Sequence, residues 1–168
     1  MDILKTATDW AKAEVFSTSF FIVFGILFLL GSAGFWHLGK TEMAKAFVTP
    51  TIVAGILLLI IGIGLVGNNM YRLNSFPKEY EKDTAAFLES EITRADKTVK
   101  EFQNGVLKVI PCIIAVAAML IFFMEQPMWR AIGITTIAMM SVILLVDINA
   151  NARINDYHKQ LLLIEKSK

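Results

Sequence analysis

Charge is scarce in this sequence and is missing altogether from four long stretches. Asp, Glu, Lys and Arg make up only 18% of the residues, whereas an average soluble domain carries about 25%. A helix of a water-soluble bundle needs one polar face, and the first two stretches provide none. We therefore expect a membrane protein. The four uncharged stretches are residues 15–39, 46–71, 109–124 and 131–146.

Residues and motifs that support catalysis are also few. Cys112 is the single cysteine, which excludes an intrachain disulfide and a paired-thiol redox centre. The sequence contains no GxxxxGK[ST], HExxH or GxSxG motif. His37 and His158 are predicted on opposite sides of the membrane, so they cannot share a metal or haem. We expect no enzyme, no cofactor and no metal, and the net charge of +1 gives no reason to propose a nucleic acid partner.

The uncharged stretches predict an all-α, polytopic fold with four membrane-spanning helices in two hairpins. About 20 apolar residues cross a bilayer, and the last two stretches reach that length if Lys108 snorkels to the interface and Asp147 faces other helices. We expect one membrane domain over residues 1–168. Its predicted parts are an interfacial helix (1–15), span 1 (16–38), span 2 (47–67), a long cytoplasmic amphipathic helix (75–105), span 3 (106–124), span 4 (131–148) and a cytoplasmic helical tail (149–168).

The distribution of lysine and arginine predicts the orientation in the membrane. The two short loops between spans contain only Lys40, Lys45 and Arg130, whereas the N-terminal segment, the middle segment and the tail contain the others. Basic residues are enriched on the cytoplasmic side. We therefore expect both termini in the cytoplasm and take a bacterial inner membrane as the setting.

The middle segment carries the pattern of an amphipathic helix. Ser75 is a suitable N-cap and Pro77 falls in the first turn. We expect this helix to continue into span 3 with a kink near Pro111. Its apolar stripe is expected to pack on a similar stripe in the tail, formed by Ile154, Tyr157, Leu161 and Ile164. The stripe of the middle segment consists of Tyr80, Thr84, Phe87, Leu88, Ile92, Ala95, Val99, Phe102 and Val106.

Small residues of span 2 form two stripes: Gly55, Gly62 and Asn69 recur every seven residues, and Gly64 and Gly67 add a second stripe. Small residues let helices approach closely in lipid. We interpret them as a helix-packing face, with a pore-lining face as the alternative. The predicted packing residues are Gly55, Gly62, Gly64 and Gly67.

The cytoplasmic ends of spans 2 and 4 resemble each other at a constant offset of 81 residues, which indicates a weak internal repeat. If the repeat is real, its polar residues face one another across the cytoplasmic mouth of the bundle. The alternative is that the arginines only follow the positive-inside rule and favour the helix dipole, and that the asparagines only cap or end the helices. Asp147 lies at the same end of span 4, and we expect Arg72 to be its partner. The candidate cluster is Asn68, Arg72, Asn74, Asp147, Asn149, Arg153 and Asn155.

Two classes of function remain. The first is a non-catalytic membrane accessory or interaction protein, such as a regulatory or immunity-type partner of another membrane protein. The second is a small oligomeric channel or transporter for an ion or solute, in which the glycines and the polar cluster line a path. The expected partners are the lipid bilayer and either further copies of the chain or another membrane protein.

Overall fold

The structure is a computed structural model that describes residues 2–166, and every regular element in that range is a helix. Seven helical segments follow one another along the chain. They are α1 (Ile3–Leu38), α2 (Glu42–Ala46), α3 (Val48–Lys82), α4 (Thr84–Glu101), the π-helix η1 (Phe102–Val106), α5 (Leu107–Phe123) and α6 (Pro127–Lys166).

Three of these helical stretches are long and apolar enough to cross a membrane, namely Ile3–Leu38, Glu42–Lys82 and Pro127–Lys166. The prediction of a helical membrane protein is confirmed at this level. The stretch expected to form span 3 is a shorter apolar helix, Lys108–Phe123.

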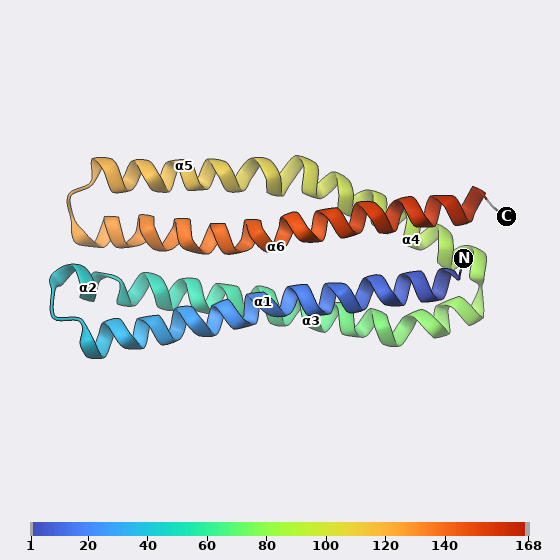
Figure 1. Cartoon of the computed structure of the whole chain (residues 1–168), viewed down its shortest axis with the longest axis horizontal. Coiled ribbons are helices and arrows are strands. Elements are labelled where there is room, and N and C mark those ends of the chain that lie inside the picture. Colours follow the sequence, from blue (N-terminus) through green and yellow to red (C-terminus); the bar gives the residue numbers. More distant parts are fainter. Residues whose placement is uncertain (1, 167–168) are drawn as a thin grey trace.

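The long helices form two antiparallel hairpins that lie along one another (Figure 1). Helix α1 packs chiefly on α3, and α5 packs chiefly on α6, while α6 also contacts α1, α3 and α4. Both chain termini and α4 lie at one end of the bundle, which we call the terminus end. The opposite end, which carries α2 and the turn between α5 and α6, is called the loop end.

The interfacial helix predicted over residues 1–15 is not separate from span 1. Asp2 accepts a hydrogen bond from the Leu4 backbone N–H at 3.0 Å and so caps a helix that runs unbroken to Leu38. The hydroxyl residues near the middle of α1 do not interrupt the helix. Thr18 and Ser19 donate to the carbonyls of Glu14 and Val15, both at 2.7 Å, and thereby satisfy their polarity within the helix.

We expected the cytoplasmic helix to begin at Ser75, but the break between helices lies eight residues later, at Asp83. This predicted boundary is wrong. Helix α3 continues through Pro77, and the Ser75 hydroxyl donates to the Arg72 carbonyl instead of capping a new helix. Asp83 is the cap, because its carboxylate accepts hydrogen bonds from the N–H groups of Ala85 and Ala86 at 2.9 and 3.0 Å. Asparagine and aspartate rank among the strongest N-caps.

The helical path from α4 into α5 is irregular at a different place from the one expected. The π-helix Phe102–Val106 contains Gly105, while α5 runs through Pro111. A proline cannot donate to the carbonyl four residues before it, and its ring crowds that carbonyl. In this chain that residue is Leu107, so the widened π turn directly precedes the disturbed position.

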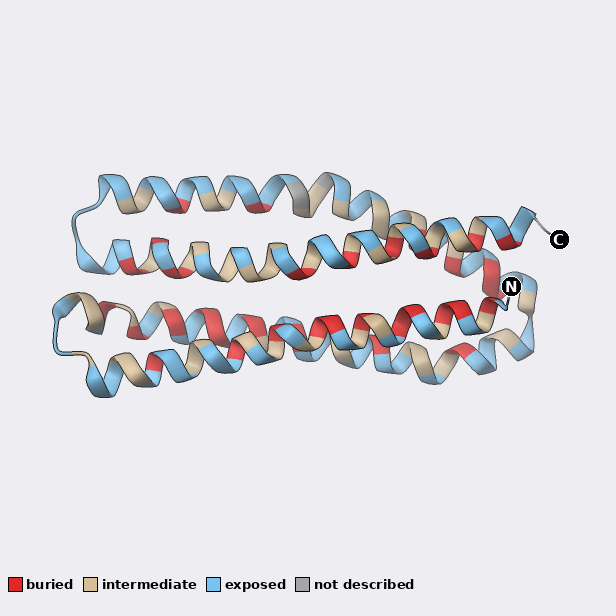
Figure 2. Cartoon of the chain, in the orientation of Figure 1, coloured by how far each residue is buried: buried red, intermediate tan, exposed pale blue. Residues whose placement is uncertain are grey.

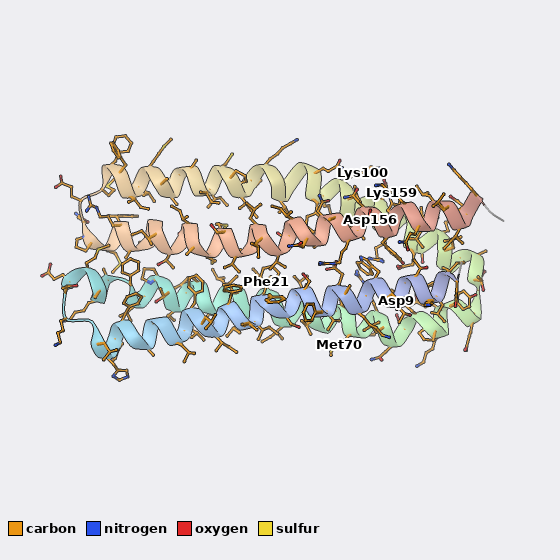
Figure 3. The ribbon with its side chains drawn as sticks, in the orientation of Figure 1. Asp9, Phe21, Met70, Lys100, Asp156 and Lys159 are labelled. Atoms are coloured by element: carbon orange, nitrogen blue, oxygen red, sulfur yellow. The ribbon has the colours of Figure 1, made fainter. Side chains whose placement is uncertain are left out.

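The main hydrophobic core lies at the terminus end (Figure 2). It combines apolar residues of α1, α3, α4 and α6, including Phe87 and Ala95 from the middle segment and Ile154 and Leu161 from the tail. The predicted packing of these two stripes is confirmed. A smaller cluster of Phe21, Leu58 and Val146 lies farther along the bundle between the two hairpins, where Figure 3 shows Phe21.

Large apolar side chains cover the outside of the long helices. Leu30, Ile60 and Phe122 are 62%, 63% and 82% exposed. Soluble monomers rarely expose apolar patches of this extent, so this surface fits contact with lipid or with another membrane helix.

Candidate functional site: a polar cavity between the hairpins

A cavity of about 210 Å³ lies between the two hairpins toward the terminus end. Residues of α1, α3, α4, η1 and α6 line it, and more than half of its lining side chains are polar or aromatic. We call it the polar cavity. Its lining residues are Trp10, Glu14, Thr18, Phe21, Leu65, Asn68, Asn69, Arg72, Arg94, Thr98, Phe102, Val146, Asp147, Ala150 and Ile154.

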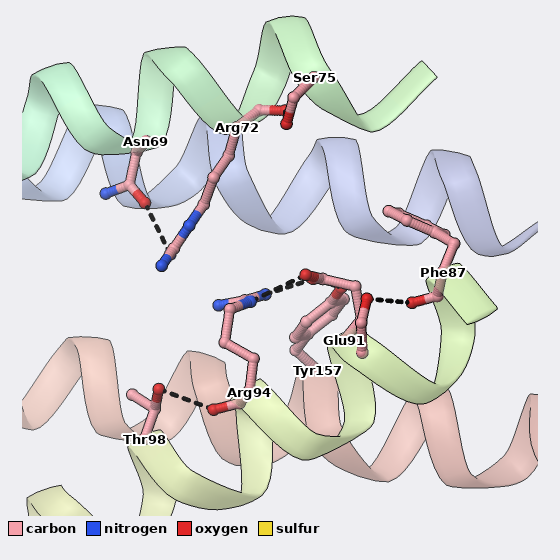
Figure 4. Close-up of polar contacts among 9 residues, drawn as sticks. Asn69, Arg72, Ser75, Phe87, Glu91, Arg94, Thr98 and Tyr157 are labelled. Carbon is pink, nitrogen blue, oxygen red and sulfur yellow. Dashed lines mark hydrogen bonds and ion pairs between the residues drawn. The ribbon is translucent and has the colours of Figure 1, made fainter. Parts of the chain in front are cut away.

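Arg94 of α4 lines one wall of the cavity, and Glu91 of the same helix and Tyr157 of α6 lie beside it and fix its position (Figure 4). Arg94 Nε donates to Glu91 Oε1 at 2.9 Å, a second guanidinium nitrogen bonds the other oxygen, and Tyr157 Oη donates to Glu91 Oε2 at 2.5 Å. Burial alone would lower the pKa of Arg94, but the hydrogen bonds and negative charge of Glu91 outweigh burial and raise that pKa. Arg94 is therefore a fully compensated cation.

Trp10 of α1 completes this wall. Its ring stacks on Tyr157 with 5.0 Å between centroids, and the Arg94 guanidinium carbon lies 4.3 Å from the centroid of the Trp10 ring. Such a cation–π contact further stabilises the position of the Arg94 guanidinium. Trp10 is 9% exposed, and its buried Nε1 has no hydrogen-bond partner among the described residues.

A second ion pair joins α1 to α6. Arg153 Nε donates to Glu14 Oε1 at 3.0 Å, and the Glu14 side chain is 8% exposed. This contact joins residues 139 positions apart in the sequence. It ties the N-terminal helix to the tail and compensates the charge of Glu14.

Arg72 and Asp147 line the same cavity, but the expected ion pair between them is not formed. Within the described part of the chain, the Arg72 guanidinium donates only to the side-chain oxygen of Asn69, at 3.4 Å, and it lies 5.9 Å from the Trp10 ring centroid. The charge that acts on Asp147 is the carboxylate of Glu14. Arg72 lines the cavity from the α3 wall, and Asp147 lines it from the α6 wall.

The remaining residues of the candidate cluster are dispersed. Asn68 lines the polar cavity, whereas Asn74 is exposed on α3. Asn149 and Asn155 donate to the carbonyls of Leu145 and Asn151 in their own helix, at 2.8 and 2.7 Å. The two halves of the repeat therefore do not face each other as a symmetric polar ring.

Charged and polar side chains gather at the terminus end, as the labelled Asp9, Lys100, Asp156 and Lys159 illustrate (Figure 3). The charged and aromatic residues at the cavity that were not predicted from the sequence include Trp10, Glu14 and Arg94, together with Glu91 beside it. Glu91 carried a signal, because it lies three residues after Leu88 and four before Ala95, on the apolar stripe itself. A carboxylate at such a position needs a buried partner.

The four glycines of the candidate packing face separate into two pairs. A Cβ atom at Gly55 would lie 2.9 Å from the Gly25 carbonyl oxygen, and one at Gly62 would lie 2.8 Å from the Ile22 side chain, so both positions require glycine for contact with α1. A Cβ atom at Gly64 or Gly67 would meet nothing within 4 Å. This second pair faces away from the rest of the described chain.

Comparisons with protein-family models, curated proteins and solved structures find no match for this chain.

Proposed function

We propose that this chain is a non-catalytic accessory protein of a cell membrane, such as a bacterial inner membrane, that spans the bilayer four times and binds another membrane protein. Both termini are cytoplasmic in this proposal. The shared terminus end, together with the few basic residues in the turns of the loop end, supports that orientation.

The fourth span in this proposal is α5. Its 17 residues rise about 26 Å at ~1.5 Å per residue, and the helical turns of η1 continue it toward the ~30 Å of a hydrocarbon core. Helix α5 packs closely on α6, since a Cβ atom at Gly133 would lie 2.8 Å from the Ala117 carbonyl oxygen. Helices α5 and α6 therefore form a closely packed hairpin.

The observation that carries the binding role is the second glycine pair of α3. Gly64 and Gly67 lie on an uncovered face, beside Ile60 and Ile63, which are 63% and 61% exposed. Small residues on a membrane helix allow another helix to approach closely. On the same helix, Gly55 and Gly62 provide such a contact with α1. We therefore assign the uncovered pair to a helix of the partner.

The experiment compares Gly64→Leu and Gly67→Leu with Gly64→Ala and Ile63→Leu after mild solubilisation of native membranes. We expect the two Gly→Leu variants to lose the co-purified partner, Gly64→Ala to retain less of it than the wild-type chain, and Ile63→Leu to retain it fully, because any side chain at a glycine hinders close approach and a larger one hinders it more. Mass spectrometry identifies the partner as a second copy or another protein. A wild-type chain that purifies without a partner, or Gly64→Leu and Gly67→Leu chains that keep one, would contradict the proposal.

A small channel or transporter is the second candidate. A further cavity of about 280 Å³ lies between α3 and α6 toward the loop end. The cluster of Phe21, Leu58 and Val146, with neighbouring residues of α6, lies between the two cavities along these helices. A hydrophobic constriction between two vestibules can act as a gate by excluding water.

Ion flux into liposomes tests this second candidate. If the apolar cluster is a gate, Phe21→Ala and Leu58→Ala increase flux severalfold over the wild-type chain, and Phe122→Ala on the outer face of α5 does not. Equal flux from all of these proteins and from empty liposomes would eliminate the channel.

A further inference from the structure

The polar cavity holds one positive and one negative side chain that form no salt bridge in the described part of the chain. Arg94 is compensated by Glu91, and Glu14 is compensated by Arg153. Arg72 and Asp147 remain, and neither has a salt-bridge partner among the described residues. The cavity is therefore neutral as a whole but charged locally.

Arg72 lines the cavity from α3 and Asp147 lines it from α6, and no salt bridge joins them within the described residues. The positive Arg94 and the negative Glu91 and Glu14 act on Arg72, whereas the negative Glu14 acts on Asp147. A group that carried only a negative charge would satisfy Arg72 and leave Asp147 unpaired, and a simple cation would do the reverse. An unpaired charge in a poorly solvated site is costly. Only a ligand with both charges satisfies both walls.

The mouth of the cavity fits a ligand that arrives from the membrane. Leu65 and Asn68, one turn apart on α3, are its exposed lining residues, whereas Phe21 and Val146 close the inner side. A volume of about 210 Å³ lies below the ~300–1,000 Å³ of pockets that enclose a drug-sized molecule. It accommodates a head group and leaves any acyl chains outside.

We propose that the polar cavity binds a zwitterionic phosphate–ammonium group, as in the head group of phosphatidylethanolamine. Arg72, supported by the Asn69 side chain, binds the phosphate, since a guanidinium offers paired donors to phosphate oxygens. Asp147 accepts hydrogen bonds from the primary ammonium. Trp10 Nε1, buried at the cavity wall without a partner, is a further donor available to the phosphate.

The test measures binding to the purified, delipidated full-length chain by native mass spectrometry. The probes are dioleoyl phosphatidylethanolamine, the choline lipid, whose quaternary ammonium has no N–H, and the glycerol lipid, which has no ammonium. We expect the ethanolamine lipid to bind about tenfold more tightly than the glycerol lipid, the scale of one lost charged contact, and more tightly than the choline lipid. Soluble O-phosphoethanolamine is then added to the complex with the ethanolamine lipid. Displacement of the lipid shows that the free zwitterion is sufficient for binding, and no displacement shows that the ligand is the lipid.

Two variants separate the two walls. In Asp147→Asn, which nearly keeps the side-chain shape, the ethanolamine and glycerol lipids should bind alike because the ammonium contact is gone. In Arg72→Gln, all three lipids should bind about tenfold more weakly, and Arg72→Lys should restore part of the affinity by returning the positive charge.

Matched controls lie outside the cavity. Arg130→Gln removes a cation that donates to the Met124 carbonyl at the loop end, and Asp156→Asn removes an exposed carboxylate on the tail. Both should bind all lipids as the wild-type chain does. Equal wild-type binding of the ethanolamine and glycerol lipids, or an ethanolamine preference that survives Asp147→Asn in a folded protein, would overturn the proposal.

Discussion

At the scale of single residues, the terminus end is organised by buried charges whose partners come from distant segments. Glu91 is 5% exposed and accepts hydrogen bonds from Arg94 and Tyr157. Breaking a buried pair leaves an uncompensated charge, which costs more than the pair itself contributes. Glu91 is therefore the residue whose loss should most strongly affect this end of the bundle.

We predict that Glu91→Ala lowers the free energy of unfolding by about 3 kcal/mol, because it leaves Arg94 and the Tyr157 hydroxyl without their acceptor. Thermal unfolding in detergent measures the change. The matched control is Glu101→Ala, which removes a carboxylate paired at 3.8 Å with Lys97 on the exposed side of α4. Exposed pairs contribute about 0–1 kcal/mol, so equal effects of the two variants would contradict this role.

The residue scale is also where prediction from sequence was weakest. The membrane-spanning stretches and the packing stripes could be predicted from the sequence because they depend on local composition and local spacing. The Glu14–Arg153 pair joins residues 139 positions apart and depends on how the hairpins dock, which no local pattern contains. For the same reason Arg72 and Asp147, which line one cavity, were predicted to pair with each other although no salt bridge joins them among the described residues.

At the scale of helices, the close contact between α1 and α3 depends on glycines. Gly62 lies against the backbone nitrogen of Ile22, where an added Cβ atom would approach to 2.9 Å. Backbone atoms cannot yield as a flexible side chain can. The hairpin therefore tolerates no side chain at this position without separation of the two helices.

We predict that Gly62→Ala destabilises the protein by about 1–3 kcal/mol through overpacking. Gly64→Ala, two residues away on the uncovered face, should instead be neutral or stabilise by up to ~1 kcal/mol, since alanine favours the helix. Thermal unfolding of the two variants side by side provides the measurement. The account of the two glycine pairs fails if both variants are destabilised alike.

The boundary between α3 and α4 offers a second test at this scale. Asp83→Ala should cost about 1 kcal/mol because it removes the acceptor for two N–H groups. Ser75→Ala should change stability by less than about 0.5 kcal/mol, because Ser75 lies inside α3. A larger loss for Ser75→Ala than for Asp83→Ala would move the helix start back to the position expected from the sequence.

That boundary also shows why the sequence alone misplaced a helix start. Ser75 and Pro77 have the spacing of an N-cap followed by a first-turn proline, and Asp83 has no proline beside it. The structure favours Asp83 because the turn there lets α4 fold back, so that Phe87 contacts Phe76 with ring centroids 5.5 Å apart. Tertiary packing, rather than the local signal, decides which cap is used.

At the scale of the whole molecule, the two hairpins give the chain a terminus end rich in ion pairs and an apolar length beyond it. Helix α6 links the parts, since it contacts α1, α3, α4 and α5. The proposed accessory role places the chain across the bilayer four times, with the terminus end at the cytoplasmic surface. That orientation is the central claim.

Cysteine labelling of intact cells tests it most directly. In a chain carrying Cys112→Ser, single cysteines are introduced as Thr41→Cys, Glu125→Cys, Ser90→Cys and Lys166→Cys, and a membrane-impermeant maleimide is added outside. The account predicts labelling at positions 41 and 125, with positions 90 and 166 labelled only after permeabilisation. Labelling of positions 90 and 125 from the same side would show that α5 does not cross the membrane and would contradict the account.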